Sequence, residues 1–251
     1  ARLSRARMQA VPIERIRVDA PAREARELLL LALGCSAVAG AAAAAAARWP
    51  LPLYPGADFT ADGWYVLGFM LGGCLLWLRW RSYRLADVLV RWRPRGWGWA
   101  GVLLALGAGT AVNAQHLAPL QELLADGVPA GSLALGVMLP LVAAAIPEEL
   151  AFRALLQTRL EKTSGRLVAI GLSTVLFTLW HLPSRFLLSS GVEGSAGDPA
   201  SILTGTALPV FVVGLVFAAI WDRWRSFAVL VALHFAIDLL PSLRHAAGGT
   251  F

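Results

Sequence analysis

Apolar residues occur along the chain in blocks of roughly 16 to 22 residues, separated by short charged or Pro/Gly-containing segments. About 20 apolar residues in a helix cross a hydrocarbon core of roughly 30 Å. The pattern therefore predicts an all-α fold, a polytopic membrane helical bundle of about seven transmembrane helices. These helices are expected at residues 28–47, 63–78, 97–113, 132–158, 166–182, 202–220 and 226–243.

The composition agrees with a membrane protein. Of 251 residues, 57% are hydrophobic and 15% are charged, which leaves too little polar surface to coat a soluble globule of this size. The first apolar block follows a basic stretch, as a cleaved signal peptide does, but about 20 residues are enough to span a bilayer. We therefore expect a retained helix there. Cys35 and Cys74 lie within apolar blocks and are expected to be small buried hydrophobes.

The placement of Lys and Arg indicates how the chain lies in the lipid bilayer. Most of them fall in 1–26, 79–95, 159–166 and 223–225, all on one side of the predicted spans. By the positive-inside rule, this side and the N-terminus are cytoplasmic. The same rule accounts for the net charge of +6 without a nucleic-acid partner. The Ala/Arg-rich composition is typical of a GC-rich bacterial genome, so we expect the spans to lie in a bacterial inner membrane. The opposite side carries only Arg48, Arg185 and Arg244, and Arg153 is left as the one cation within a predicted span.

Three regions follow from this pattern. A basic cytoplasmic segment covers 1–27, N-terminal transmembrane helices cover 28–125, and a C-terminal transmembrane core covers 126–245. The connecting segments 48–62, 114–131 and 183–201 are predicted to be outer loops without a folded second domain.

Several ionisable side chains lie inside the predicted spans. An ionisable group at the centre of a bilayer costs roughly 2.5 to 3.5 kcal/mol, so its presence there suggests a functional site. The residues are Glu148, Glu149 and Arg153 in the fourth span, His181 in the fifth, and His234 and Asp238 in the seventh.

Counting along the helices places these groups at one depth. The fourth and fifth spans form a hairpin with its turn at 163–165, so Glu148 and His181 lie at equal heights, roughly 20 to 25 Å from the turn. His234 and Asp238 lie roughly 17 to 22 Å above the turn near Arg223. The side chains of all three helices can therefore meet.

Spacing within each helix predicts two local pairs. Residues four apart share a helix face, so Glu149 is expected to pair with Arg153, and His234 is expected to converge with Asp238. Adjacent glutamates point about 100° apart, so Glu148 has a different partner from Glu149. Kinks are expected at 140 and 147, where proline interrupts the fourth span.

These groups are suited to the hydrolysis of a peptide bond. Glu148 can take a proton from a water that His181 holds or relays, and His234 can donate a hydrogen bond to the oxyanion. Taken singly, a histidine in a span or the Glu149 and Arg153 pair could be structural. The co-occurrence of all of them at one depth on three helices favours a functional cluster. His116 and His245 lie in a loop and the tail, where solvated positions are expected.

Three motifs in this region resemble those of the CPBP intramembrane proteases, the CAAX prenyl protease type II family. Residues 148–153 read EELAFR and resemble the EExxxR motif, residues 177–181 resemble FxxxH, and residues 234–238 resemble HxxxN/D. The resemblance covers about 130–240. It implies a glutamate-dependent endopeptidase, with Glu148 and His181 activating water, His234 and Asp238 stabilising the oxyanion, and Glu149, Arg153 and Phe177 in support.

The residue at 238 departs from the commoner asparagine of that family. An aspartate donates a hydrogen bond only when it is protonated. We expect a protonated donor there, because Arg153 is committed to Glu149 and no other cation is evident. The alternative is an ionised Asp238 that orients His234.

The function expected from the sequence is that of a membrane-embedded endopeptidase that cleaves near the end of a peptide or membrane-anchored protein without a cofactor. Prenylated tails, leader peptides and sorting segments all remain open as substrates. One alternative is a zinc peptidase, since carboxylates and imidazoles bind zinc, although no HExxH is present. The other is a non-proteolytic immunity or transport protein that uses the same polar cluster.

Overall fold

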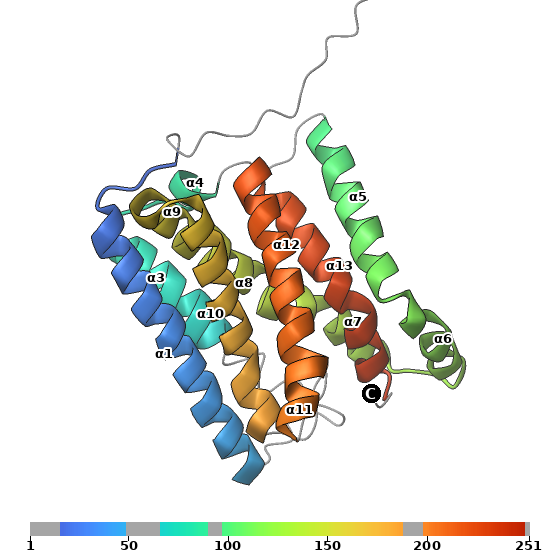
Figure 1. Ribbon diagram of the computed structural model, residues 1–251. Helices are drawn as coiled ribbons and strands as arrows, with labels where there is room; N and C mark the ends of the chain where they lie inside the picture. Colours follow the sequence, from blue (N-terminus) through green and yellow to red (C-terminus); the bar gives the residue numbers. More distant parts are fainter. Residues whose placement is uncertain (1–15, 49–65, 90–96, 188–197, 249–251) are drawn as a thin grey trace, which may run out of the picture.

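The structure is a computed structural model that describes residues 16–48, 66–89, 97–187 and 198–248. This part of the chain is a helical bundle without strands, which confirms the predicted fold class (Figure 1). Its helices are α1 (Pro21–Arg48), η2 (Val66–Leu71), α3 (Gly72–Trp80), α4 (Leu85–Val88), α5 (Trp97–Val112), η3 (Ala114–His116), α6 (Leu117–Ala125), α7 (Ala130–Leu139), η4 (Pro140–Ala145), α8 (Ile146–Glu148), η5 (Glu149–Gln157), α9 (Thr158–Ser164), α10 (Arg166–Leu187), α11 (Pro199–Ile202), η6 (Leu203–Ala207), α12 (Leu208–Trp224) and α13 (Phe227–Ala246).

Five of these helical stretches have the length and composition to cross a membrane. They are Pro21–Ala42, Ala130–Ser164, Arg166–Pro183, Pro199–Trp224 and Phe227–Ala246. The two other predicted spans correspond to shorter apolar helices within the described residues, namely the continuous η2 and α3, and α5. The chain is therefore a multi-pass membrane protein.

The hairpin turn predicted between the fourth and fifth spans is confirmed. Helix α9 ends at Ser164, and Gly165 has a φ of +83° before α10 begins at Arg166. Glycine adopts this left-handed conformation without the steric penalty that a Cβ atom brings. After the turn, α10 runs antiparallel to the helix that ends in α9 and packs against it. The two glutamates and His181 can therefore meet farther along the hairpin.

The fourth span is one long helical stretch with wide turns near its prolines. The wide π-helical turns occupy Pro140–Ala145 and Glu149–Gln157. Proline removes a backbone donor and clashes with the preceding turn, which favours such irregularity. Isolated π-helical turns occur frequently at functional sites, and the second one here contains Glu149 and Arg153.

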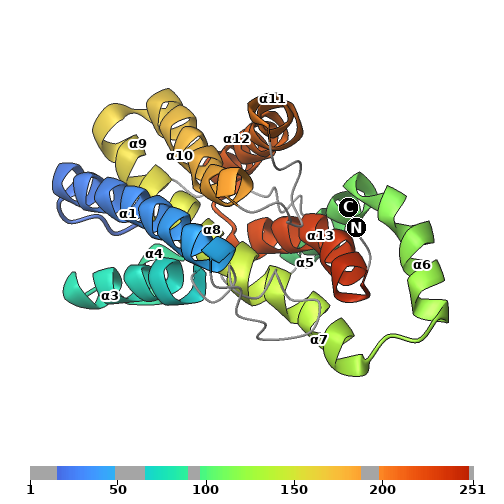
Figure 2. The same cartoon turned by 90° about the horizontal axis from the view of Figure 1, so that it is seen from below.

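Helix α13 lies in the middle of the bundle, next to α5, α7 and α12 (Figure 2). Small residues let α5 approach it closely. A Cβ atom added at Gly109 would come within 2.7 Å of both the Leu233 carbonyl oxygen and the Ala236 Cβ. Close packing through small residues is a common way for membrane helices to associate, and it fixes the position of the helix that carries His234 and Asp238.

A second group of buried charges joins α1 to α9, and we call it the Glu24–Arg159 cluster. The Oε1 atom of Glu24 accepts from the Ala20 amide at 2.8 Å and from the Tyr83 hydroxyl at 2.8 Å, and its Oε2 atom accepts from Arg159 Nε at 3.2 Å. Burial raises the pKa of Tyr83 to about 12, so its hydroxyl stays protonated and donates.

This cluster adds a second fully buried arginine to Arg153, the one cation predicted within a span. Arg159 lies just beyond the predicted end of that span at residue 158, and its side chain is fully buried. Nothing in the sequence pattern indicated this burial, because the partner of Arg159 lies on α1, 135 positions away.

The connecting segment 114–131 also differs from the prediction, since it contains η3 and α6. Helix α1 begins at Pro21, earlier than the predicted start at 28, and α10 continues to Leu187. The predicted loop 48–62 lies, apart from Arg48, outside the described residues, as do 188–197 of the loop predicted at 183–201.

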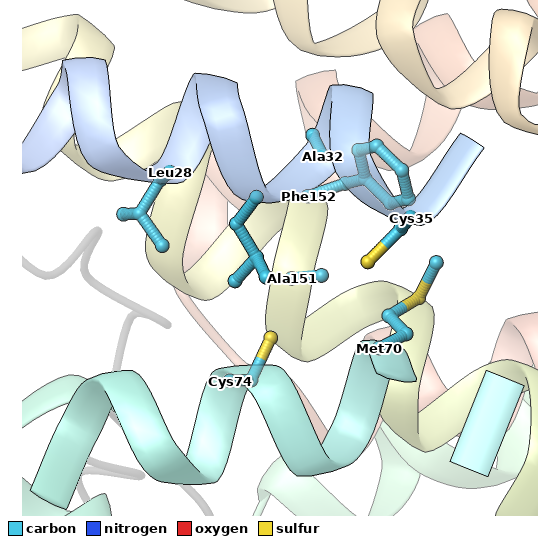
Figure 3. Close-up of a pocket in the computed structure, with 8 residues that line it drawn as sticks. Leu28, Ala32, Cys35, Met70, Cys74, Ala151 and Phe152 are labelled. Atoms are coloured by element: carbon cyan, nitrogen blue, oxygen red, sulfur yellow. The ribbon is translucent and has the colours of Figure 1, made fainter. Parts of the chain in front are cut away.

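The two cysteines are free thiols buried between α1 and α3, in agreement with the expectation from the sequence. Cys35, Cys74 and Met70 face a small apolar cavity that Phe152 also borders (Figure 3). Its volume is only about 10 Å³, which is about the space that one water molecule needs. The cysteines therefore act as packing residues.

Candidate active site

Glu148 and Glu149 lie where α8 meets η5, and both side chains are buried. As the helix geometry predicts, they turn to different partners. Glu148 faces His181 and Trp180 on α10, whereas Glu149 faces Arg153 and His234.

Glu149 is held between a guanidinium and an imidazole. Its Oε1 atom lies 3.3 Å from Arg153 Nη1, which confirms the predicted pair, and 2.7 Å from His234 Nδ1 on α13. The contact with His234 joins two different helices, so the spacing of residues within one helix could not predict it. Glu149 thus links η5 to α13 at the level of the site.

Aromatic rings surround Arg153, whose side chain is fully buried. Its guanidinium carbon lies 3.9 Å from the centre of the Phe177 ring and 5.3 Å from that of Phe217, distances typical of cation–π contacts. On the α12 side, Arg153 Nη2 donates to the Gly214 carbonyl at 3.4 Å. These contacts explain how a buried cation is tolerated, and they place the Phe177 ring against Arg153.

The hydrogen bonding of His181 defines its tautomer. Its Nδ1 atom lies 2.8 Å from the Phe177 carbonyl oxygen, one turn earlier on α10. Because a carbonyl oxygen only accepts, Nδ1 must carry a proton and donate it. In the neutral ring, Nε2 is therefore an acceptor, and it faces Glu148 Oε2 at 3.7 Å.

Glu148 lies between the two histidines. Its Oε2 atom is 3.7 Å from His181 Nε2 and 3.9 Å from His234 Nε2, and its Oε1 atom accepts from Trp180 Nε1 at 3.4 Å. The contacts to the histidines are longer than direct hydrogen bonds, so a water molecule fits the chemistry of the gap. The structure thus brings together the glutamate and the two histidines that the sequence placed at one depth.

His234 and Asp238 converge as predicted, with Nε2 and Oδ2 3.2 Å apart. Both ring nitrogens of His234 therefore face carboxylate oxygens, one from Glu149 and one from Asp238. The sequence argument for a protonated Asp238 assumed that no cation was near it. The His234 ring can carry that positive charge, so the geometry favours the alternative in which Asp238 accepts from His234.

A cavity of about 440 Å³ opens beside these groups. His181, His234 and Asp238 line it, and its remaining wall is largely apolar, with Val210 and Val213 from α12. This volume lies within the range of about 300 to 1,000 Å³ that is typical of sites for small ligands.

The same contacts bear on the zinc alternative. Within the described residues, no three His, Cys, Asp or Glu side chains are arranged to hold a metal ion. The zinc alternative stays a prediction, and chelation of the purified protein tests it.

Sequence reasoning missed several residues around the site. Phe217 and Gly214 contact Arg153, and Trp180 donates to Glu148. Aromatic residues and glycines are common throughout apolar helices, so nothing in the pattern distinguished these three. His116, expected to be solvated, lies in the cavity wall.

The comparison with protein families agrees with this geometry. Residues 130–240 match the family model described as type II CAAX prenyl endopeptidase Rce1-like. This part of the chain is similar to that family. The match coincides with the region in which the three motifs resembled those of CAAX proteases, and it confirms that resemblance. No curated protein and no solved structure matched the chain.

The Rce1-like segment contains every residue of the candidate site. It extends from the start of α7 to α13 and includes Glu148, Glu149, Arg153, His181, His234 and Asp238. Helices α1, η2 and α5 pack around it from outside the matched region.

Proposed function

We propose that the chain is a membrane-embedded endopeptidase that hydrolyses a peptide bond near the end of a peptide or membrane-anchored protein. The observation that supports this most strongly is the arrangement of Glu148 Oε2 and His181 Nε2, two acceptors 3.7 Å apart at the level of a cavity. Two acceptors at this separation can each take one hydrogen of a bridging water.

In the proposed reaction, the bridging water is the nucleophile. Glu148 takes one of its protons while the water oxygen bonds to the carbonyl carbon of the substrate. His181, fixed by its hydrogen bond to Phe177, keeps the water oriented. Glu148 then passes the proton to the departing amine, and the peptide C–N bond breaks.

His234 supplies the donor for the oxyanion in this proposal. Its Nδ1–H donates to Glu149, and its Nε2–H, which faces Asp238 in the free protein, is shared between Asp238 and the carbonyl oxygen when the substrate is bound. The state with both nitrogens protonated is positively charged, and it stabilises an oxyanion more strongly than a neutral ring. Arg153 and Glu149 hold the ring in place, and Asp238 orients its second nitrogen.

The family description indicates a prenylated protein with a C-terminal CAAX sequence as the first substrate class to test. The apolar cavity wall is compatible with an apolar C-terminal segment. We also propose that the N-terminus is cytoplasmic, because the positively charged loops gather on that side.

The test is cleavage of lipid-anchored peptides by the purified protein in liposomes, followed by mass spectrometry in oxygen-18 water. Three peptide sets are needed: prenylated C-terminal tails, leader peptides and sorting segments. The proposal predicts one oxygen-18 atom in the new carboxyl group and no product from Glu148→Gln. Loss of activity on chelation with recovery on adding zinc would favour a metallopeptidase, and absence of cleavage by folded protein would favour a non-proteolytic role.

A further inference from the structure

Helix α12 is attached to the helix that carries the glutamates by a row of polar contacts. Arg153 and Gln157 lie four residues apart on the fourth span, about one turn of helix. Arg153 Nη2 donates to the Gly214 carbonyl at 3.4 Å, and Gln157 Nε2 donates to the Ala218 carbonyl at 2.9 Å. The two acceptors are also four residues apart, so the two hydrogen bonds bridge η5 and α12 one turn after the other.

The row continues toward the turn at the end of α9. Trp221 Nε1 donates to Thr158 Oγ1 at 3.1 Å, and Arg225 forms an ion pair with Glu161. We call this row of contacts, from the Gly214 carbonyl to the Arg225 ion pair, the α12 seam. It fixes where α12 lies along and against the fourth span.

Other side chains of α12 form part of the cavity wall. Val210, Val213 and Phe217 line the cavity, and the centre of the Phe217 ring lies 5.0 Å from that of His234. A shift or rotation of α12 would therefore change both the width of the cavity and a contact of the active-site histidine. The α12 seam determines how these side chains are presented.

Gln157 is the member of the α12 seam that stability explains least. Its side chain is fully buried, yet only one end of its amide is bonded: Nε2 donates to Ala218, whereas Oε1 has no hydrogen-bond partner among the described residues. An unsatisfied buried acceptor costs stability, and a methionine of similar length would fill the same space without this cost. The glutamine therefore calls for a role other than packing.

We propose that Gln157 is a positioning residue that holds α12 at a fixed distance from the glutamate helix and so sets the width of the cavity that receives the substrate. Its acceptor is a main-chain carbonyl, so the bond acts on the helix as a whole. Ala218 is fully buried, and its small side chain allows the close approach. Arg153 is already paired with Glu149, which leaves Gln157 to act on α12 without belonging to that ion pair.

This inference rests on the proposed endopeptidase function, because it assigns the cavity to the substrate. It predicts a specific division of effects. Glu148 and His181, which activate the water in that proposal, lie on the fourth span and α10 and not on α12. Loss of the Gln157 bond should therefore weaken substrate binding and leave the chemical step nearly unchanged.

The first measurement needs no substrate. Spin labels at Leu104→Cys on α5 and Val216→Cys on α12, both exposed positions, report the distance between the two helices by double electron–electron resonance. The two native thiols are buried and stay in place. Gln157→Met should shift or broaden the distance distribution. Leu156→Met is the matched control, because it is a volume-conserving change at the next buried position and should leave the distribution as in wild type.

The second measurement is KM and kcat for the peptide that is cleaved fastest among prenylated tails, leader peptides and sorting segments. Gln157→Met should raise KM about three- to tenfold, as expected for one lost hydrogen bond, with kcat nearly unchanged and no fall in the thermal unfolding midpoint. Gln157→Asn, whose amide is one methylene shorter, should act in the same direction and provides the test if Gln157→Met does not fold.

An unchanged distance distribution in Gln157→Met, or an unchanged KM, would overturn the positioning role. So would a lower midpoint with neither of these changes, which would make Gln157 a purely structural residue, or equal effects of Gln157→Met and Leu156→Met. If folded wild type cleaves none of the peptides but Gln157→Met still shifts the distribution, the proposed peptidase activity fails while the positioning of α12 by Gln157 is supported.

Discussion

The molecule contains two buried charged clusters, and they differ in how completely their polar atoms are satisfied. In the Glu24–Arg159 cluster, both Glu24 oxygens accept hydrogen bonds and Arg159 donates from all three of its nitrogens. In the active site, Glu149 Oε2 and Arg153 Nε have no hydrogen-bond partner among the described residues.

The second difference is access. Three members of the active-site cluster line a cavity of about 440 Å³, whereas Glu24 and Arg159 are not part of its wall. A fully satisfied, closed cluster is suited to holding helices together, and a partly satisfied one beside a cavity is suited to binding and chemistry. Burial of charge in a membrane protein is therefore not by itself a sign of catalysis.

The largest combined effect is expected for Glu149→Gln, because Glu149 serves both stability and the orientation of His234. The change leaves Arg153 as a buried cation without its ion pair and should lower the free energy of unfolding by about 3 to 5 kcal/mol. Cleavage should fall by about 10² or more as His234 loses its anchor. Thermal unfolding in detergent and peptide cleavage measure the two effects.

A double variant separates these contributions. Glu149→Gln with Arg153→Gln removes both charges, so stability should partly recover while activity stays low. Recovery of activity together with stability would show that the pair has only a structural role.

Glu24→Gln should produce the opposite pattern. It removes the charge that pairs with Arg159, and we expect a loss of about 3 to 5 kcal/mol in stability. Cleavage per folded molecule should remain close to wild type, because the cluster lies apart from the cavity. Glu122→Gln, at an exposed position on α6, is the control and should change neither property. A specific loss of cleavage in folded Glu24→Gln would break the distinction between the two clusters.

Asp238→Asn tests the revised role of that residue. An amide cannot accept from His234 Nε2–H as strongly as a carboxylate does, so activity should fall by about 10 to 100-fold with little change in stability. The measurement is the pH profile of cleavage for both proteins. A variant with full activity, beside a wild type that loses activity as the pH rises, would instead support the protonated donor expected from the sequence.

The smallest effect is expected for Gly214→Ala. A Cβ atom there would lie 3.1 Å from Phe177 Cδ1 and 3.1 Å from Thr174 Cγ2, so α12 or the Phe177 ring must shift slightly. We expect a loss of about 1 to 3 kcal/mol and a modest fall in cleavage, since Phe177 contacts both Arg153 and His181. Gly171→Ala, on the neighbouring α10 with nothing within 4 Å of its added Cβ, is the control and should be close to neutral.

The features that the sequence predicted well are those with local causes. Apolar blocks indicated the spans, Gly165 marked the turn, and four-residue spacing predicted the Glu149–Arg153 and His234–Asp238 contacts. Counting residues from the turn predicted that Glu148 and His181 lie at the same depth, and in the structure their side chains are 3.7 Å apart.

The features that it missed depend on contacts between distant helices. The bonds of His234 to Glu149 and of Arg159 to Glu24 span 85 and 135 positions, and no local pattern specifies such partners. For the same reason, His116 was predicted to be solvated. Its contact with Arg244 forms only because α13 packs beside the segment that contains His116. The role of Asp238 was inferred without knowledge that the His234 ring faces it.

The central claim is that Glu148 activates the water while adding little to stability, and Glu148→Gln tests it most directly. The measurement is the single-turnover rate of peptide cleavage, paired with the thermal unfolding midpoint of the same preparation. The account predicts a rate lower by about 10² to 10⁴ with a nearly unchanged midpoint, because the general base is lost and the fold is retained. A Glu148→Gln variant that folds normally and cleaves near the wild-type rate would contradict it.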